Sequence, residues 1–486
     1  MQPLLSKRSS PLASARSNRT SQGFELNDDE VEHLLLQELD QTREEGNELQ
    51  RLGVNEEDGD ALDEDNPLFT DLDAGSSIWD ASFNFTNSIV GAGIIGLPYA
   101  FWQAGFVAGV VLLTVLSLAV DWTVLLLVKD AKLAGKATYQ GLIQHCYGRQ
   151  GLILISFAQF IFAYGAMCAY TVILGDTLPL VFSQFISSES PFSFFVSRQA
   201  VIVVCTLSVS LPLSLYRDVS ALSRTSAVSI VMIVFIVVSV VFAAFSVPAE
   251  QRGDQTKQLT VMRSGIFRAI GVISFAFVCH HNTFLIYNSL RVPTMNRFAT
   301  VTHLSTGASY LLCLAMACGG YLAFIDKSQA NILSNFPSNH LVINIARFFF
   351  GVNMFLTFPL ECFVCREVLF NLWWSDENLS AHLLAERATP MQHILTTLTL
   401  VLTSMVIALA TCDLGFLLEL TGGSSASVLA YIMPAACFLK LSSGPILSTK
   451  RIMPLVSIVF GVCVMVLSTF FAISSFLDSN APHKQC

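Results

Sequence analysis

Eleven long apolar stretches limit what this chain can fold into. A bilayer core of about 30 Å is crossed by about 20 residues of helix. Only 13% of the 486 residues are charged, about half the share of a soluble chain. The sequence therefore predicts an all-α polytopic membrane protein with eleven transmembrane helices. They cover residues 78–104, 106–127, 151–181, 200–215, 221–246, 264–289, 300–325, 341–370, 391–411, 413–439 and 453–476.

The first 75 residues differ sharply from the membrane domain at 76–476. They hold 19 acidic and six basic side chains and too few apolar residues to offset the entropy of ordering. We expect a disordered cytosolic tail, and a short lumenal or extracellular tail at 477–486. Within the first tail, Glu30, Leu34 and Leu35 have the spacing of a dileucine sorting signal for an adaptor. One turn of a nascent amphipathic helix would give the same pattern.

The charges of the short loops predict the orientation. Lys and Arg resist translocation and collect on the cytosolic side. With the N-terminus in the cytosol, the inside loops hold thirteen Lys and Arg residues and the opposite loops hold six. A cytosolic N-terminus is therefore favoured.

The first apolar stretch contains residues that disfavour a helix near its middle. Gly91, Gly93 and Gly96 fall within six residues, and Pro98 follows. In a helix interior, glycine costs about 1 kcal/mol and proline about 3 kcal/mol relative to alanine, and backbone groups released in lipid need another partner. This pattern predicts a helix broken near Val90 to Gly93, whose free backbone groups face a ligand. Close helix packing through small residues is the alternative.

The sixth stretch has a similar interruption, because His280, His281 and Asn282 lie well inside it. Two interrupted helices at corresponding places in two five-helix halves are typical of an inverted-repeat transporter, which holds its substrate at mid-membrane. The sequence therefore predicts a 5+5 inverted repeat with broken helices 1 and 6, and an additional helix 11.

Four motifs in this domain resemble the amino acid/auxin permease family, and within it the sodium-coupled neutral amino acid transporters and the fungal vacuolar amino acid transporters. They lie at residues 84–100, at 274–280 with Ile286 and Tyr287, at 356–359, and at 420–426 through Pro434. The resemblance covers residues 76 to about 476. It implies a fold of the leucine-transporter type and secondary active transport of amino acids, chiefly neutral ones, by alternating access.

The resemblance also implies how a substrate would be held. Backbone N–H groups in helix 1 would bind the carboxylate at a helix N-terminus, and carbonyl groups in helix 6 would bind the ammonium. The expected substrate-binding residues are Val90, Gly91, Ala92, Gly93, Ser274, Phe275, Ala276 and Phe277.

The resemblance also implies a coupling cation, either Na⁺ or H⁺. In sodium-coupled relatives the ion lies between helices 1 and 8, which here implies Asn87 and Thr357 as oxygen ligands of a possible Na⁺ site; Thr357 would also suit an interhelical hydrogen bond. His280 is the candidate for proton coupling, because histidine titrates near physiological pH, or it is a neutral hydrogen-bonding partner. Further ionisable residues within spans are functional candidates by default: Asp121, His281, Glu361 and Glu419.

Three function classes fit a chain of this kind to different degrees. An amino acid carrier in the lipid bilayer is favoured, and a transporter-like amino acid sensor that signals through its N-terminal tail is the alternative. The loops contain neither a metal-ligand cluster nor a nucleophile with a partnered base, so we expect no enzyme. We expect no cofactor other than the coupling ion, and no nucleic-acid partner.

The loop after the fifth stretch bears on the location. Residues 247–263 are short and contain no cysteine, whereas plasma-membrane members of the resembled family have a long, cysteine-bridged loop there. Together with the dileucine pattern, this favours a vacuolar, lysosomal or other internal membrane.

Overall fold

The computed structural model describes residues 75–186, 190, 193–216, 226–374, 389–442, 445 and 448–477. The predicted tails lie almost wholly outside these ranges. The proposed sorting motif at Glu30, Leu34 and Leu35 lies outside them too.

Eight helical segments within the described ranges are long and apolar enough to cross a membrane. The fold is all-helical in these ranges, as predicted, with one isolated β-bridge between Ser76 and Leu290. The helices within the eight segments are α5 (Phe106–Ala134), α6 (Tyr139–Phe182), α10 (Ser226–Phe245), α13 (Met295–Phe324), α14 (Leu341–Trp374), α16 (Pro390–Ala410), α17 (Leu414–Thr421), α18 (Met433–Leu441) and α19 (Thr449–Leu477). The π-helical segments η7 (Gly422–Ala426) and η8 (Val428–Ile432) join α17 to α18.

Three further apolar segments are built from shorter pieces. The first consists of α3 (Ile78–Ile89), the 3₁₀ helix η1 (Ala92–Gly96) and α4 (Leu97–Ala104). The second consists of α7 (Arg198–Cys205), the π-helix η3 (Thr206–Ser210) and α8 (Leu211–Ser214). The third consists of α11 (Ile266–Phe277) and α12 (Thr283–Ser289). The interruptions in the first and third segments confirm the two predicted helix breaks.

Local sequence signals set several of these boundaries. Ser77 caps α3, because its hydroxyl accepts the Asp80 N–H at 3.2 Å. Gly105, with φ of 91°, turns the chain between α4 and α5, and Gly135, with φ of 64°, ends α5. A further kink lies inside α6 at Gly148, where φ is 61°. Short 3₁₀ turns occupy the connections: η2 (Ser193–Val196), η4 (Gln255–Lys257), η5 (Ile325–Lys327) and η6 (Ile332–Asn335).

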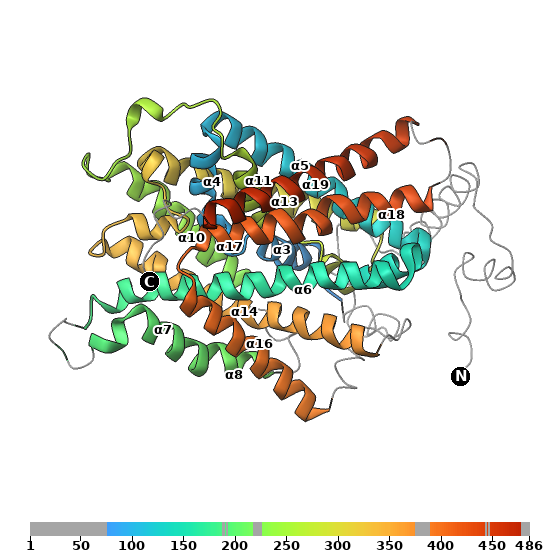
Figure 1. Cartoon of the computed structure of the whole chain (residues 1–486), viewed down its shortest axis with the longest axis horizontal. Coiled ribbons are helices and arrows are strands. Elements are labelled where there is room, and N and C mark those ends of the chain that lie inside the picture. The colour runs from blue at the N-terminus through green and yellow to red at the C-terminus, as the bar shows by residue number, and fades with distance from the viewer. Residues whose placement is uncertain are drawn as a thin grey trace, which may run out of the picture.

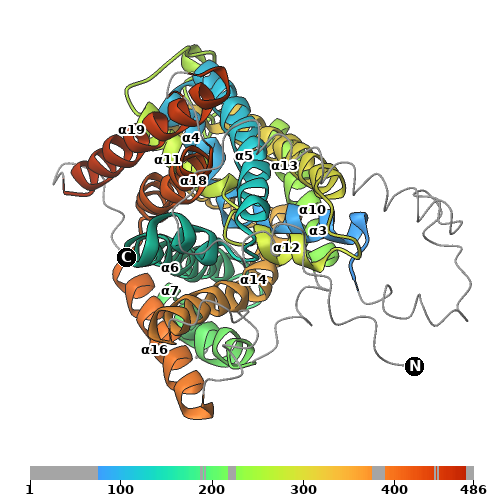
Figure 2. The ribbon, with the colours of Figure 1, turned by 90° about the vertical axis from the view of Figure 1, so that its right-hand side faces the viewer.

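The helices form two groups that lie against each other (Figures 1 and 2). In one group α6 packs along α14, with α7, α8 and α16 beside them. In the other group α13 packs against α3, α4 and α5, and α11 packs against α4 and α5. The two interrupted segments, α3–η1–α4 and α11–α12, therefore both belong to the second group. The helix α10 and the α17–α18 segment contact both groups.

Glycine allows the backbones of α11 and η7 to touch. A Cβ atom on Gly422 would lie 1.9 Å from the carbonyl oxygen of Gly271, far inside ordinary van der Waals contact. This close crossing is the small-residue packing expected between membrane helices.

Candidate functional site

The first interruption leaves backbone N–H groups without acceptors in their own helix. After α3 ends at Ile89, Val90 donates its N–H to the Thr86 carbonyl at 2.8 Å, and Gly91 donates to Ile89 at 3.0 Å. The next N–H groups, on Ala92 and Gly93, lie in the first turn of η1, where a helix offers its donors no acceptor. Of the four predicted residues, Ala92 and Gly93 are thus the ones whose amides can bind an anion.

The second interruption exposes carbonyl groups. Ser274 accepts the N–H of Val278 at 3.1 Å, and the helix ends at Phe277. The carbonyls of Phe275, Ala276 and Phe277 belong to the last turn, where no N–H group of their own helix donates to them. The two interruptions also touch, because a Cβ on Gly93 would lie 2.6 Å from the Cα of Ala276. Donors and acceptors of the backbone are thereby brought close together.

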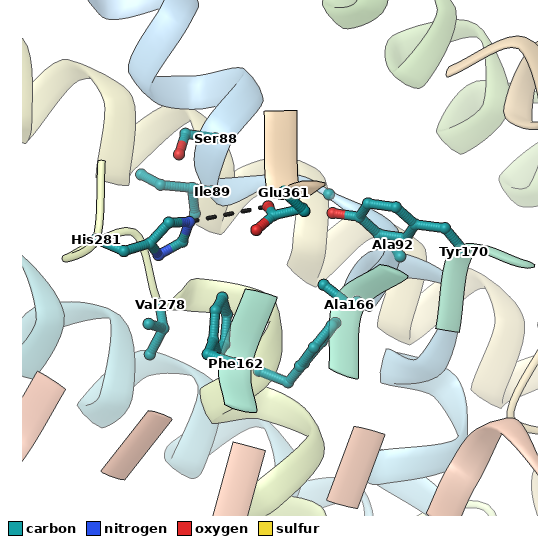
Figure 3. A pocket seen from close by; sticks show the side chains of 12 residues that line it. Ser88, Ile89, Ala92, Phe162, Ala166, Tyr170, Val278, His281 and Glu361 are labelled. Carbon is teal, nitrogen blue, oxygen red and sulfur yellow. Dashed lines mark ion pairs between the residues drawn. The ribbon is translucent and has the colours of Figure 1, made fainter. Parts of the chain in front are cut away.

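A cavity lies where these segments meet (Figure 3). It is lined by four parts of the chain, and its volume is about 20 Å³, enough for a water molecule and too little for an amino acid. Side chains that line the cavity must therefore move to admit a substrate. The lining residues are Ser88, Ile89, Gly91, Ala92, Gly93, Phe162, Ala166, Tyr170, Phe275, Val278, His281 and Glu361.

Two ionisable side chains face each other in this cavity. The His281 Nε2 atom lies 3.8 Å from the Glu361 Oε1 atom, and the two side chains are 2% and 11% exposed. Figure 3 shows the Tyr170 hydroxyl pointing toward the same carboxylate from the opposite side. This cluster gives the otherwise apolar cavity a polar wall.

A hydrogen-bonded amide connects the histidine to the first interrupted helix. The Asn282 Nδ2 atom lies 2.8 Å from the Ser88 hydroxyl and 3.0 Å from the His281 Nε2 atom. A rearrangement at either interruption would therefore break or shift a hydrogen bond made by the other.

The predicted ion-coupling residues Asn87, His280 and Thr357 are not among the residues that line the cavity. His280 is fully buried and its Nε2 atom lies 3.0 Å from the Thr123 hydroxyl of α5. The Asn87 amide lies 3.5 Å from the Ser226 hydroxyl of α10, and its Oδ1 atom is buried without a hydrogen bond. Thr357 donates its hydroxyl to the Asn353 carbonyl at 2.9 Å. Of the predicted substrate residues, Val90, Ser274, Ala276 and Phe277 also do not line the cavity.

A second buried polar cluster joins three of the helices. Arg268 of α11 donates to Glu419 of α17 at 2.7 Å and to the Tyr99 hydroxyl of α4 at 2.8 Å. The Tyr99 hydroxyl in turn donates to Glu419 at 3.0 Å. Two of these helices continue directly into the interrupted segments, so this cluster fixes where the segments lie.

Some lining residues were absent from the sequence-based prediction. Phe162, Ala166 and Tyr170 lie four residues apart on one face of α6, a spacing that is visible in the sequence. Glu361 and His281 stood out as ionisable residues within spans, although the sequence did not place them together. In the described part of the chain, no three His, Cys, Asp or Glu side chains converge to hold a metal ion.

Comparison with known proteins identifies relatives over most of the chain. Residues 74–474 match the family described as "Transmembrane amino acid transporter protein". Vacuolar amino acid transporter 2 of Saccharomyces cerevisiae is 38% identical over 423 residues, which are 86% of this chain and 88% of that protein. A Bos taurus protein provisionally named sodium-coupled neutral amino acid transporter 11 is 38% identical over 400 residues, which are 82% of this chain and 84% of that protein.

Among solved structures, the manganese transporter of Eremococcus coleocola aligns with 86% of this chain and 90% of its own. The TM-score is 0.49 and the sequence identity is 12%, a likeness too distant for structural or functional inference.

Proposed function

This chain belongs to the transmembrane amino acid transporter family, and from that premise we propose that it is a secondary active carrier of neutral amino acids, driven by a cation gradient. The observation behind the proposal is the cavity between the two helix interruptions, where backbone donors and acceptors come close together. Members of such a family move solutes and are not enzymes. The relatives' names give no support to the alternative of a sensor.

Both charged ends of a zwitterion would have backbone partners beside this cavity once its lining side chains move to admit the substrate. The amides of Ala92 and Gly93 suit a carboxylate, because the N-terminal turn of a helix favours an anion. The carbonyl of Phe275 suits an ammonium group, and it lies at the C-terminal turn of α11. Ile89, Phe162 and Val278 supply an apolar wall for the substrate side chain. An uncharged side chain therefore fits the site best.

The carrier would have eleven spans with an inverted repeat of the leucine-transporter type. The eight long segments and the three shorter ones would supply the eleven. In this scheme α3–η1–α4 corresponds to α11–α12, α5 to α13, α6 to α14, α7–α8 to α16, and α10 to α17–α18, with α19 additional. The packing supports the scheme, because helices at corresponding places in the two halves lie in the same group. The pair α6 and α14 lies in one group, and the two interrupted helices lie in the other.

The N-terminus would lie in the cytosol. The loop charges support this orientation, because thirteen Lys and Arg residues would then lie in the cytosolic loops and six in the opposite loops. An internal membrane is favoured, since one relative carries the name of a vacuolar transporter.

Uptake into proteoliposomes tests the proposal. Purified protein would be supplied with labelled neutral amino acids, first with unlabelled substrate inside for counterflow, then under a pH gradient or a Na⁺ gradient. We expect counterflow of at least one neutral amino acid and its accumulation under one gradient. Binding without counterflow would refute the carrier and favour a sensor. If Na⁺ is the driver, Thr357→Ala should weaken the Na⁺ dependence.

A further inference from the structure

The cavity wall contains a single acid and a single base. Among its lining residues, Glu361 is the only carboxylate, His281 is the only basic side chain, and Tyr170 is the third titratable group. The two ionisable groups come from different segments, α14 and the interruption after α11. No Lys or Arg among the lining residues competes for the carboxylate.

The contacts of this pair leave room for a proton. The separation of 3.8 Å between Nε2 and Oε1 is longer than a hydrogen bond. The Nδ1 atom of His281 and the Oε2 atom of Glu361 are buried without hydrogen-bond partners. Asn282, which lies 3.0 Å from Nε2, can meet either form of the ring, because an amide offers both a donor and an acceptor.

The net charge of the pair depends on whether it holds one proton. With that proton the pair is neutral overall, either as an imidazolium beside a carboxylate or as an imidazole beside a carboxylic acid. Without it, the pair carries one negative charge, and among the lining residues there is no Lys or Arg to balance that charge.

We propose that His281 and Glu361 form the proton-binding site through which a pH gradient drives transport. This inference rests on the proposed carrier function and identifies its cation. A zwitterionic substrate has no net charge, and its two ends meet backbone groups. The loaded cavity is therefore neutral only when the pair holds its proton, so one H⁺ moves with each amino acid in the same direction.

Two other histidines in the described part of the chain, His280 and His303, lack this arrangement. His280 lies outside the cavity, against Thr123. Asp121 and His303 form a closer pair, at 2.9 Å, but the His303 side chain is 60% exposed and neither residue lines the cavity. The Asp121 and His303 pair also joins a carboxylate to an imidazole, but outside the cavity. Asp121→Asn is therefore the matched control.

The test separates coupling from translocation. Glu361→Gln imitates the protonated carboxyl group permanently. We expect its accumulation of substrate under an acid-outside pH gradient to fall about tenfold or more, because the site no longer exchanges a proton. Counterflow at equal pH should continue and become independent of pH. Asp121→Asn should retain both activities.

Several results would overturn the proposal. Accumulation by Glu361→Gln at the wild-type ratio would exclude the pair as the coupling site. Loss of counterflow in this variant would make Glu361 a substrate ligand instead. A measurement on the wild-type protein does not depend on folding of the variant: a pH-sensitive dye inside the vesicles should report about one H⁺ per amino acid without Na⁺. Absence of proton movement during Na⁺-driven uptake would also overturn it. Failure of wild-type counterflow for every amino acid would instead refute the carrier function.

Discussion

Adding a single methyl group at Gly93 should disturb both helix interruptions at once. A Cβ atom there would lie 2.6 Å from the Cα and 2.7 Å from the Cβ of Ala276. Carbon atoms in good contact are about 3.5–4.0 Å apart, so η1 and α11 must separate by about 1 Å. Neither atom of Ala276 lies on a flexible side chain that could move aside. The backbone itself must shift.

We expect two consequences of Gly93→Ala. Overpacking of this kind costs about 1–3 kcal/mol of stability, which a lower Tm of the detergent-purified protein would report. A misplacement of about 1 Å in a substrate site can reduce turnover on the order of 10²-fold, which uptake into proteoliposomes would report. The membrane insertion of the variant should be normal.

Two other glycines provide controls for this experiment. A Cβ on Gly91 meets only the Tyr170 hydroxyl, at 3.6 Å, so Gly91→Ala should leave packing nearly unchanged while it narrows the cavity and raises KM. A Cβ on Gly307 meets nothing within 4 Å, so Gly307→Ala tests the glycine-to-alanine change alone. If Gly93→Ala matched the wild type in Tm, KM and maximal rate, the close approach of the interruptions would be wrong.

Two further predictions concern charged groups away from the cavity. Glu419→Gln removes the carboxylate that lies 2.7 Å from the Arg268 guanidinium. Because Arg268 is 23% exposed, we expect the free energy of unfolding to fall by about 1–3 kcal/mol, less than for a fully buried pair, which a lower Tm would report. Arg268→Gln added to this variant should restore part of the lost stability. In the loop near η4, hydrogen bonds from Thr256 hold the pKa of Asp254 at about 2, and the backbone N–H of Asp254 lowers the pKa of Asp326. Because both pKa values are lowered, their stabilisation of the loop is present above the ordinary value of 3.8 and is lost as pH falls through the folded values. Pepsin should therefore cleave this loop at pH 2 and spare it at pH 4, and equal cleavage at both would contradict the assignment.

The helix interruptions could be predicted because their causes are local. Glycine and proline change the backbone wherever they occur, and the first helix ends at Ile89, directly before the glycine-rich segment. Pro98 then lies in the first turn of α4, where proline is well tolerated. The predicted break near Val90 to Gly93 needed no knowledge of the neighbouring helices.

The cavity wall opposite these interruptions could not be predicted in the same way. Tyr170 on α6 and Glu361 on α14 reach the cavity through the rotation of each helix about its axis, which is set by packing. Both helices are apolar on most sides, so their sequences give no single buried face. The length and order of such helices can be read from the sequence, and the side chains that meet cannot.

The two neighbouring histidines illustrate where sequence reasoning stops. A motif position favoured His280, yet His280 contacts Thr123 while His281 faces Glu361. Both lie between the end of α11 and the start of α12, where the chain has neither the 3.6-residue period of a helix nor the 2-residue period of a strand. Without a period, adjacent side chains can point to different partners for reasons that lie entirely in the tertiary structure. The same irregularity lets one segment place one imidazole in the cavity and the neighbouring imidazole against α5, and a sequence pattern does not predict which of the two takes which place.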